Sequence, residues 1–340
     1  MSLLDVRDLR VHIPGPAGPA KAVDGLDLRI RKGEAVGVVG ESGSGKTVLA
    51  LSLLGLQPGG ADAILPDSSI RFRGGELTSA SPDRLRSIRG AGIAMIFQEP
   101  MTSLNPVFTV GNQIGESLTL HRGMTGASVR KEVERLLSEV GIPDPEARAG
   151  DFPHELSGGM RQRVMMAMAL AGKPDLLIAD EPTTALDNTI EAQVLTLMKE
   201  VQVKRGMGLL LISHDLSVVS RVCDRVVVLY GGQVVECGQT REILESPKHP
   251  YTVGLLESRL LWEDGRRTLT PIPGEVPEAG VWPGGCRFHT RCPEALEMCG
   301  REEPELISYG GVAEDPPPTS HGGPGGRRVR CWLTAREEGA

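Results

Sequence analysis

The sequence predicts an α/β protein with a largely parallel β-sheet, followed by a shorter C-terminal segment of different composition. Short β-branched or apolar runs alternate with helical patterns over roughly the first 260 residues, which is typical of parallel sheets covered by helices. Apolar residues make up 40% of the 340, enough for a substantial core. Further along, residues 271–285 and 310–326 are rich in glycine and proline, and such segments cannot continue a helix or a strand.

The predicted elements alternate along the chain. We expect strands over Ala35–Val39, Gly92–Phe97, Leu176–Asp180, Leu209–Ser213 and Arg225–Leu229. We expect helices over Thr47–Leu56, Arg130–Val140, Gly159–Ala171, Ile190–Arg205 and Ser217–Cys223. Gly231 and Gly232 separate the last strand from another apolar run, which is the pattern of a β-hairpin.

The overall composition argues against several classes of protein. A net charge of −7 and an aromatic content of 3% do not suit a chain whose main partner is a nucleic acid. No apolar run approaches the roughly 18–20 residues needed to cross a bilayer, and the charged N-terminus is not typical of a signal peptide. We therefore expect a soluble, cytoplasmic chain with reduced cysteines, in which a cysteine cluster indicates a metal before a disulfide.

Residues 40–47 form a glycine-rich motif between a predicted strand and a predicted helix. They match the pattern G-x-x-x-x-G-K-[ST], whose backbone N–H groups surround a phosphate at the start of the helix. The alternative is a glycine-rich turn without a ligand. We expect Lys46 to reach the β- and γ-phosphates of a bound nucleotide and the Thr47 hydroxyl to ligate Mg²⁺. The predicted phosphate-binding residues are Gly40, Glu41, Ser42, Gly43, Ser44, Gly45, Lys46 and Thr47.

Two carboxylates follow the apolar strand predicted over Leu176–Asp180. Acidic residues at the carboxyl end of a parallel sheet lie where such folds bind ligands. Beside the phosphate loop, Asp180 is expected to be a second Mg²⁺ ligand and Glu181 a general base for the attacking water. Taken alone, the run also suits a strand that is buried on both faces.

Leu156–Met160 reads LSGGM and opens the helix predicted to end at Ala171. Ser157 is a good N-cap residue, and the two glycines allow a phosphate to approach the first turn closely. A capped helix start explains this segment equally well when it is considered without its neighbours.

In this order, the motifs resemble those of the ATP-binding subunits of ABC transporters, over about residues 3–250. LSGGM is similar to the family signature LSGGQ, with Met160 in place of Gln. The resemblance implies that Gln98 senses Mg²⁺ and the attacking water, and that it couples the γ-phosphate to domain closure together with His214. Residues 184–187 resemble the family's D-loop, and Ile13 or His12 stands near the position where the family stacks an aromatic ring on adenine.

The family's fold and assembly are further implications of this resemblance. They comprise a P-loop ABC ATPase domain with a RecA-like core, an antiparallel β subdomain and a helical subdomain at about 103–157. Two such domains pair head to tail, so the chain needs a second ATPase subunit, which we expect to be a paralogue. The residues expected to act in trans, on the partner's nucleotide, are Ser157, Gly158, Gly159 and Asp187.

Three segments narrow the resemblance: Gln98–Pro106, Phe152–Glu155 and His249–Thr252. They are similar to segments of the D-type ATPase of dipeptide and oligopeptide (peptide/nickel) importers. This implies a peripheral subunit at the cytoplasmic face of the cell membrane that powers a type I importer. Its partners would be two transmembrane permease subunits and, indirectly, an extracytoplasmic substrate-binding protein. The alternatives are import of nickel or another small solute, or a soluble ABC ATPase of DNA repair or translation.

The C-terminal extension, residues 251–340 after an ATPase domain of 1–250, carries four of the six cysteines. Their spacings of five, six and 31 residues lack the close pairs that zinc ribbons prefer and suit a [4Fe–4S] cluster, whose irons are further apart. Arg287 and Arg291 are placed to offset the charge of such a cluster, and similar tails of peptide-transporter ATPases carry the same cysteines. Zn²⁺ and free thiols are the alternatives, with His289 or His321 as a substitute ligand. The predicted ligands are Cys286, Cys292, Cys299 and Cys331.

Overall fold

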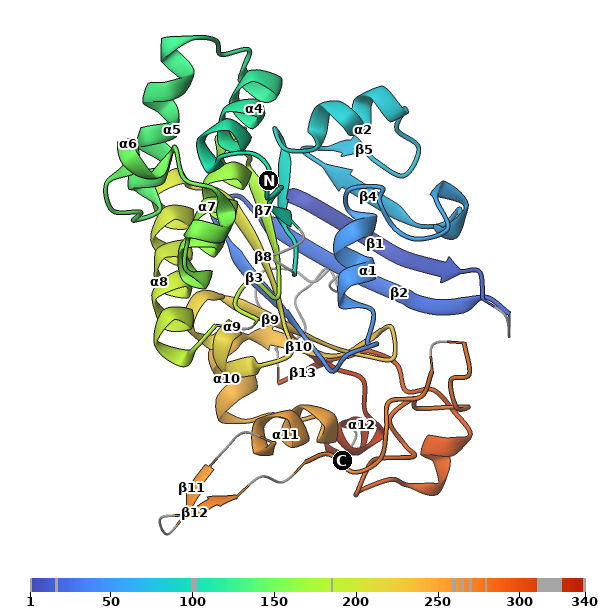
Figure 1. Ribbon diagram of the computed structural model, residues 1–340. Helices are drawn as coiled ribbons and strands as arrows, with labels where there is room; N and C mark the ends of the chain where they lie inside the picture. The colour runs from blue at the N-terminus through green and yellow to red at the C-terminus, as the bar shows by residue number, and fades with distance from the viewer. Residues whose placement is uncertain are drawn as a thin grey trace. The chain divides into compact units, whose positions relative to one another are not determined.

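The computed structural model (Figure 1) describes residues 2–15, 18–98, 103–184, 186–258, 261–263, 266–268, 271–278, 280–310 and 326–338. Its chain divides into two compact units, each assembled from segments that are far apart in the sequence. The first unit contains residues 31–35 and 80–212. The second contains residues 2–30, 36–79 and the described part of 213–340.

An antiparallel sheet in the second unit has the strand order β2-β1-β4-β5. Its strands are β1 (Ser2–Ile13), β2 (Ala20–Arg31), β4 (Ser69–Phe72) and β5 (Gly75–Glu76). The alternation of buried side chains in β1 shifts by one residue part-way along the strand. Leu4 and Val6 are buried before the shift, and Leu9 and Val11 after it. Asp8 lies between these pairs at φ 41, and such an irregularity moves the side chains that follow it to the other face of the strand. The strand therefore keeps one apolar face despite the change of period.

The second unit also contains a sheet in the order β13-β14-β10-β9-β3. β3 (Ala35–Val39) runs parallel to β9 (Arg225–Tyr230), so that Val36 pairs with Arg225 and Val39 with Val228. β9 and β10 (Gln233–Gln239) form the predicted hairpin, which is confirmed, with Gly231 at φ 56 and Gly232 at φ 80. β14 (Arg327–Val329) continues the sheet beside β10, and β13 (Ile307–Tyr309) follows it. Helices α1 (Lys46–Ser52), α9 (Leu216–Val222) and α10 (Thr240–Glu245) belong to the same unit.

The first unit combines a parallel sheet with a group of helices. β6 (Ile93–Ile96), β7 (Leu176–Asp180) and β8 (Gly208–Ser213) are parallel, and every residue of β7 and β8 is buried, as expected for strands covered on both faces. α4 contacts α5 and α7, and α7 also contacts α8 and β6. The helices of this unit are α2 (Pro82–Ile88), α4 (Val110–Arg122), α5 (Ala127–Glu139), α6 (Pro145–Arg148), α7 (Gly158–Ala171) and α8 (Asn188–Arg205).

The expected α/β class is therefore confirmed, and most of the predicted elements exist. The strands predicted over Ala35–Val39 and Leu176–Asp180 have the predicted bounds. The helix predicted over Thr47–Leu56 is too long, because α1 ends at Ser52 and Gly55 turns the chain at φ 63. No helix in the described ranges combines the length and the apolar character that a membrane span needs.

Within the second unit, the C-terminal extension packs onto β9 through an aromatic cluster. Phe288 of the extension is 1% exposed, and its ring centroid lies 5.2 Å from that of Tyr230 in β9 and 5.2 Å from that of Tyr251. Tyr251 belongs to α11 (Pro250–Glu257), which follows the ATPase motifs. The described remainder of the extension has little regular structure. It contains β11 (Leu261–Glu263), β12 (Arg266–Thr268), β13, β14, a short 3₁₀ helix (Glu297–Gly300) and α12 (Trp332–Glu338).

Candidate functional site

The phosphate loop predicted from the sequence lies between β3 and α1. A Cβ atom on Gly40 would lie 2.1 Å from the Leu229 carbonyl oxygen, so a larger residue does not fit there. Gly45 has φ 100, and a Cβ atom on it would lie 2.1 Å from the Ala22 carbonyl oxygen. Both glycines therefore let the loop pass close to neighbouring backbone, while Ser42, Gly43 and Thr47 remain exposed at its outer side.

Lys46 is folded into the phosphate loop. Its Nζ donates hydrogen bonds to the carbonyl oxygens of Gly40 at 2.7 Å and Glu41 at 2.9 Å, and the residue is 5% exposed. Ser44 is buried next to it, and its backbone N–H donates to the Glu41 carbonyl oxygen at 3.2 Å. The loop thus places an ammonium group at its centre, where it can meet a phosphate.

The two carboxylates at the carboxyl end of β7, Asp180 and Glu181, lie in the first unit together with Gln98. Asp180 is 2% exposed at the end of β7. Glu181 follows with φ 45, a conformation that is unusual for a residue with a side chain and is found most often at functional sites. The Gln98 side-chain amide donates to Glu181 Oε2 at 3.3 Å, and the Thr184 hydroxyl donates to the same oxygen at 3.1 Å. The structure therefore brings Gln98 and Glu181 together.

The signature segment forms the start of α7. Ser157 is the N-cap, as predicted, and its hydroxyl accepts a hydrogen bond from the Met160 N–H at 3.3 Å. A Cβ atom on Gly159 would lie 2.6 Å from Ile190 Cγ2, so this glycine is also required by the packing of α7 on α8. Ser157 and Gly158 are exposed and accessible to a ligand.

Two further predicted site residues lie at the starts of helices. The Asp187 carboxylate caps α8, because Oδ1 accepts from the N–H groups of Thr189 at 3.1 Å and Ile190 at 3.0 Å. His214 is exposed between β8 and α9 and belongs to the second unit, as the phosphate loop does. Residues 99–102 and 185, which belong to the Q-loop and D-loop segments, lie outside the described residues.

The four cysteines of the extension come together although 31 residues separate the last two. They line a single small cavity of about 10 Å³, whose other walls include His249, Phe288 and His289. Burial, with a smaller contribution from the other cysteines, raises the pKa of Cys286 and Cys292 to about 11. Among the residues that the structure describes, no three side chains are arranged to hold a single metal ion, and His321 lies outside them. Cys223 and Cys237 are buried in the ATPase region, as predicted.

Comparison with known proteins relates both sites to one family. A family model described as ABC transporter matches residues 23–184, and one described as oligopeptide/dipeptide transporter, C-terminal region, matches residues 235–299. The dipeptide transport ATP-binding protein DppD of Haemophilus influenzae is 45% identical over all of this chain and 98% of its own length. The protein of the same name from Bacillus subtilis is 48% identical over 97% of this chain and 94% of its own. The chain belongs to this family of ABC transporter ATP-binding proteins.

Solved structures support the same assignment for the ATPase fold. The dimeric structure of MJ0796, a bacterial ABC transporter cassette, has a TM-score of 0.62 and 27% identity. The match covers 70% of the present chain and 99% of the cassette. This ABC ATPase therefore has the expected P-loop ABC fold. The C-terminal family match ends at residue 299, so it contains three of the four cysteines and not Cys331.

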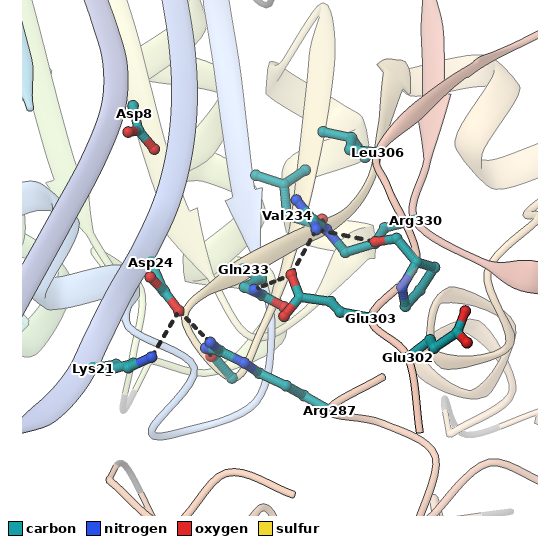
Figure 2. A network of polar contacts seen from close by, with 12 residues as sticks. Asp8, Lys21, Asp24, Gln233, Val234, Arg287, Glu302, Glu303, Leu306 and Arg330 are labelled. Carbon is teal, nitrogen blue, oxygen red and sulfur yellow. Dashed lines mark hydrogen bonds and ion pairs between the residues drawn. The ribbon is translucent and has the colours of Figure 1, made fainter. Parts of the chain in front are cut away.

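Two arginines of the extension contact the phosphate loop or the hairpin beside it, and these contacts could not be predicted from the sequence. Arg291 was expected to offset a cluster, but it donates to Glu41 Oε2 at 2.7 Å and to Glu41 Oε1 at 3.0 Å. Arg287 is ion-paired with Asp24 (Figure 2), and it also donates a hydrogen bond to the Gly231 carbonyl oxygen. The one indication in the sequence is that Arg287 and Arg291 each lie next to a cysteine.

Proposed function

We propose that this chain is the ATP-hydrolysing subunit of a type I importer for dipeptides or oligopeptides. The observation that carries the proposal is the phosphate loop, with Lys46 at its centre, in a chain matched over its whole length by a dipeptide transport ATP-binding protein. Import of nickel or another small solute uses the same ATPase chemistry and is the second candidate.

The roles of the site residues follow from their chemistry. Lys46 and the loop amides bind the β- and γ-phosphates, and Glu181 orients and deprotonates the attacking water. Gln98, which donates to Glu181, and His214 link the γ-phosphate to closure of the domain. Signature residues Ser157–Gly159, together with Asp187, serve the nucleotide of the second subunit.

A Mg²⁺ ion suits the chemistry of the three residues that we propose as its ligands. The exposed Thr47 hydroxyl, the Asp180 carboxylate and the Gln98 amide oxygen are hard oxygen ligands, which Mg²⁺ prefers. When bound, Mg²⁺ neutralises charge on the phosphates.

The proposed partners are a second, paralogous ABC ATPase, two transmembrane permease subunits at the cytoplasmic face of the membrane and, indirectly, a substrate-binding protein. Residues 1–250 form the proposed ATPase domain, with a helical subdomain at about 103–157 that contacts the permease. Three large apolar side chains support this contact, because Val107, Phe108 and Leu120 are 71%, 51% and 75% exposed.

The C-terminal extension, residues 251–340, is proposed to hold a [4Fe–4S] cluster on Cys286, Cys292, Cys299 and Cys331. Four thiols around one cavity are the donor set of such a cluster. A cluster is bound through several irons, so its ligands need not converge on one ion, and its binding supplies folding energy to a segment with little core. Zn²⁺ and free thiols are distinguished from it by the iron and zinc content of the purified chain and by its visible absorbance, since only an iron–sulfur cluster is coloured.

Transport in reconstituted vesicles tests the proposed function. The chain is purified with the proteins that accompany it and incorporated into vesicles with internal ATP. We expect uptake of labelled dipeptide that is lost in Lys46→Ala. Uptake of Ni²⁺ but not of peptide would favour the second candidate, and ATPase activity stimulated only by DNA or ribosomes would contradict both.

A further inference from the structure

The phosphate loop is held from outside the ATPase core at its second residue. The Glu41 N–H donates to Tyr251 Oη at 2.8 Å, and the Glu41 carboxylate receives two parallel hydrogen bonds from Arg291. Tyr251 and Arg291 both belong to the C-terminal extension. We propose that they are positioning residues of the phosphate loop, and that the cysteine-bearing extension sets the affinity for ATP through them. This inference rests on the proposed ATPase function.

Arg291 is fixed independently of the loop. Its side chain is 4% exposed, and its Nε donates to the Pro273 carbonyl oxygen at 2.9 Å. Its backbone N–H donates to the Phe288 carbonyl oxygen at 3.0 Å, which ties it to the buried aromatic cluster. A guanidinium held in this way can fix the direction of a carboxylate, since two parallel hydrogen bonds allow one relative orientation.

A second arginine supports the same loop through the β9–β10 hairpin. Arg287 is ion-paired with Asp24 (Figure 2) and holds the hairpin turn by donating a hydrogen bond to the Gly231 carbonyl oxygen. The next residue of the turn, Gly232, donates its N–H to the Ser44 carbonyl oxygen at 3.0 Å, and Ser44 lies within the phosphate loop. Both arginines are adjacent to cysteines of the cavity, because Arg287 follows Cys286 and Arg291 precedes Cys292. The chain around the cysteines therefore has two connections to the loop.

These contacts affect ATP binding in two ways. Glu41 is a carboxylate in a loop that receives a polyanion, and Arg291 offsets its charge at short range. The contacts to the Glu41 N–H and carboxylate also hold the loop in one conformation before the nucleotide arrives, which lowers the entropy cost of binding. Removing Arg291 leaves an unpaired carboxylate beside the phosphates and a looser loop.

Nucleotide titrations of the full chain test the inference. With a fluorescent ATP analogue and Mg²⁺, we expect Arg291→Met to raise Kd about ten-fold, within the usual range of coupling between sites. Its kcat at saturating ATP should stay within about two-fold of the unchanged chain, because Arg291 does not meet the attacking water. Arg291→Lys, which keeps the charge, should recover part of the affinity.

The matched control is Arg301→Met, an arginine of the same extension whose side chain is 72% exposed and pairs with the exposed Glu297. It should bind the analogue as the unchanged chain does. In the background of Glu41→Gln, Arg291→Met should raise Kd by less than about two-fold, since the charge it offsets is gone. Full additivity of the two changes would contradict the inference.

Tyr251→Phe provides a second test, which does not depend on whether the Arg291→Met variant folds correctly. It keeps the aromatic cluster and removes only the Oη that accepts from Glu41, so we expect Kd to rise about three-fold. If either Arg291→Met or Tyr251→Phe binds the ATP analogue as tightly as the unchanged chain, the inference is overturned, even if the melting temperature of the variant falls. Failure of the unchanged chain to bind ATP would instead overturn the proposed function.

Discussion

The Gln98 side-chain amide donates to Glu181 Oε2 at 3.3 Å, which connects the end of β6 to the carboxylate that follows β7. Glu181 adopts φ 45, and the Thr184 hydroxyl donates to the same carboxylate oxygen. A carboxylate that is directed by two donors in a strained backbone conformation suits a residue that must orient a water molecule.

Glu181→Gln is expected to lower the ATPase kcat by at least about 100-fold, because the amide cannot accept the proton of the attacking water. ATP binding should remain, since Lys46 and the loop are unchanged. Phosphate release and nucleotide affinity measured on the same preparation separate the two effects. Thr184→Val, which removes only one donor to Glu181, should have the smaller effect on kcat, and rapid turnover by Glu181→Gln would refute the assignment of the base.

Gly40→Ala is expected to abolish ATP binding. The new Cβ would lie 2.1 Å from the Leu229 carbonyl oxygen, which belongs to β9 and cannot rotate away. The loop must then move, at a cost in stability of about 1–3 kcal/mol. Gly75→Ala is the matched control, since its Cβ would be 3.5 Å from the nearest such atom, and it should bind ATP normally. Unfolding in denaturant and nucleotide titration measure both variants, and normal ATP affinity in Gly40→Ala would be inconsistent with this packing.

The helical part of the first unit contains a pH-dependent ion pair network. Hydrogen bonds from Arg135 and Arg122 lower the pKa of Glu132 to about 2, against the opposing effect of burial. Because the unfolded chain protonates this carboxylate near pH 4.3, its stabilising contribution is complete above about pH 5 and is lost as the pH falls toward 2.

Glu132→Gln should therefore unfold more easily than the unchanged chain at pH 7, by about 1–3 kcal/mol. The difference should shrink between about pH 4 and pH 2, since the glutamine resembles the protonated acid. Urea unfolding at several pH values gives this profile. Asp83→Asn breaks a pair whose side chains are 76% and 89% exposed, and it should have little effect at any pH. A difference for Glu132→Gln that is independent of pH would contradict the assigned cause.

The periodic elements and the ATP motifs could be predicted from the sequence, because both depend on local spacing. Continuous apolar runs identify β3 and β7, and the glycine-rich motif before α1 identifies the loop. The contact between Glu41 and Arg291 joins residues 250 positions apart, and no periodicity connects them. The same limit applies to the shift of period in β1, where Asp8 looks like an ordinary polar residue until its φ of 41 is known.

The cysteines illustrate both sides of this limit. Their number and spacing indicate a ligand set. Only the fold brings Cys331 to the cavity that the other three line, because β14, which comes just before Cys331, returns the chain beside β10. The roles of Arg287 and Arg291 also depend on that packing. Each has a carboxylate partner in a segment that the sequence places far away.

Cys292→Ser is expected to remove iron from the chain and to weaken ATP binding in the same preparation. The serine is a poor ligand for iron, and the segment that carries Arg291 then loses one of its attachments. Iron content, visible absorbance and the Kd for the ATP analogue are measured together. Cys223→Ala is the control, because Cys223 is buried in the ATPase region and does not line the cavity. Retention of iron in Cys292→Ser would exclude this ligand, and loss of iron with unchanged ATP affinity would show that the cavity and the phosphate loop are independent.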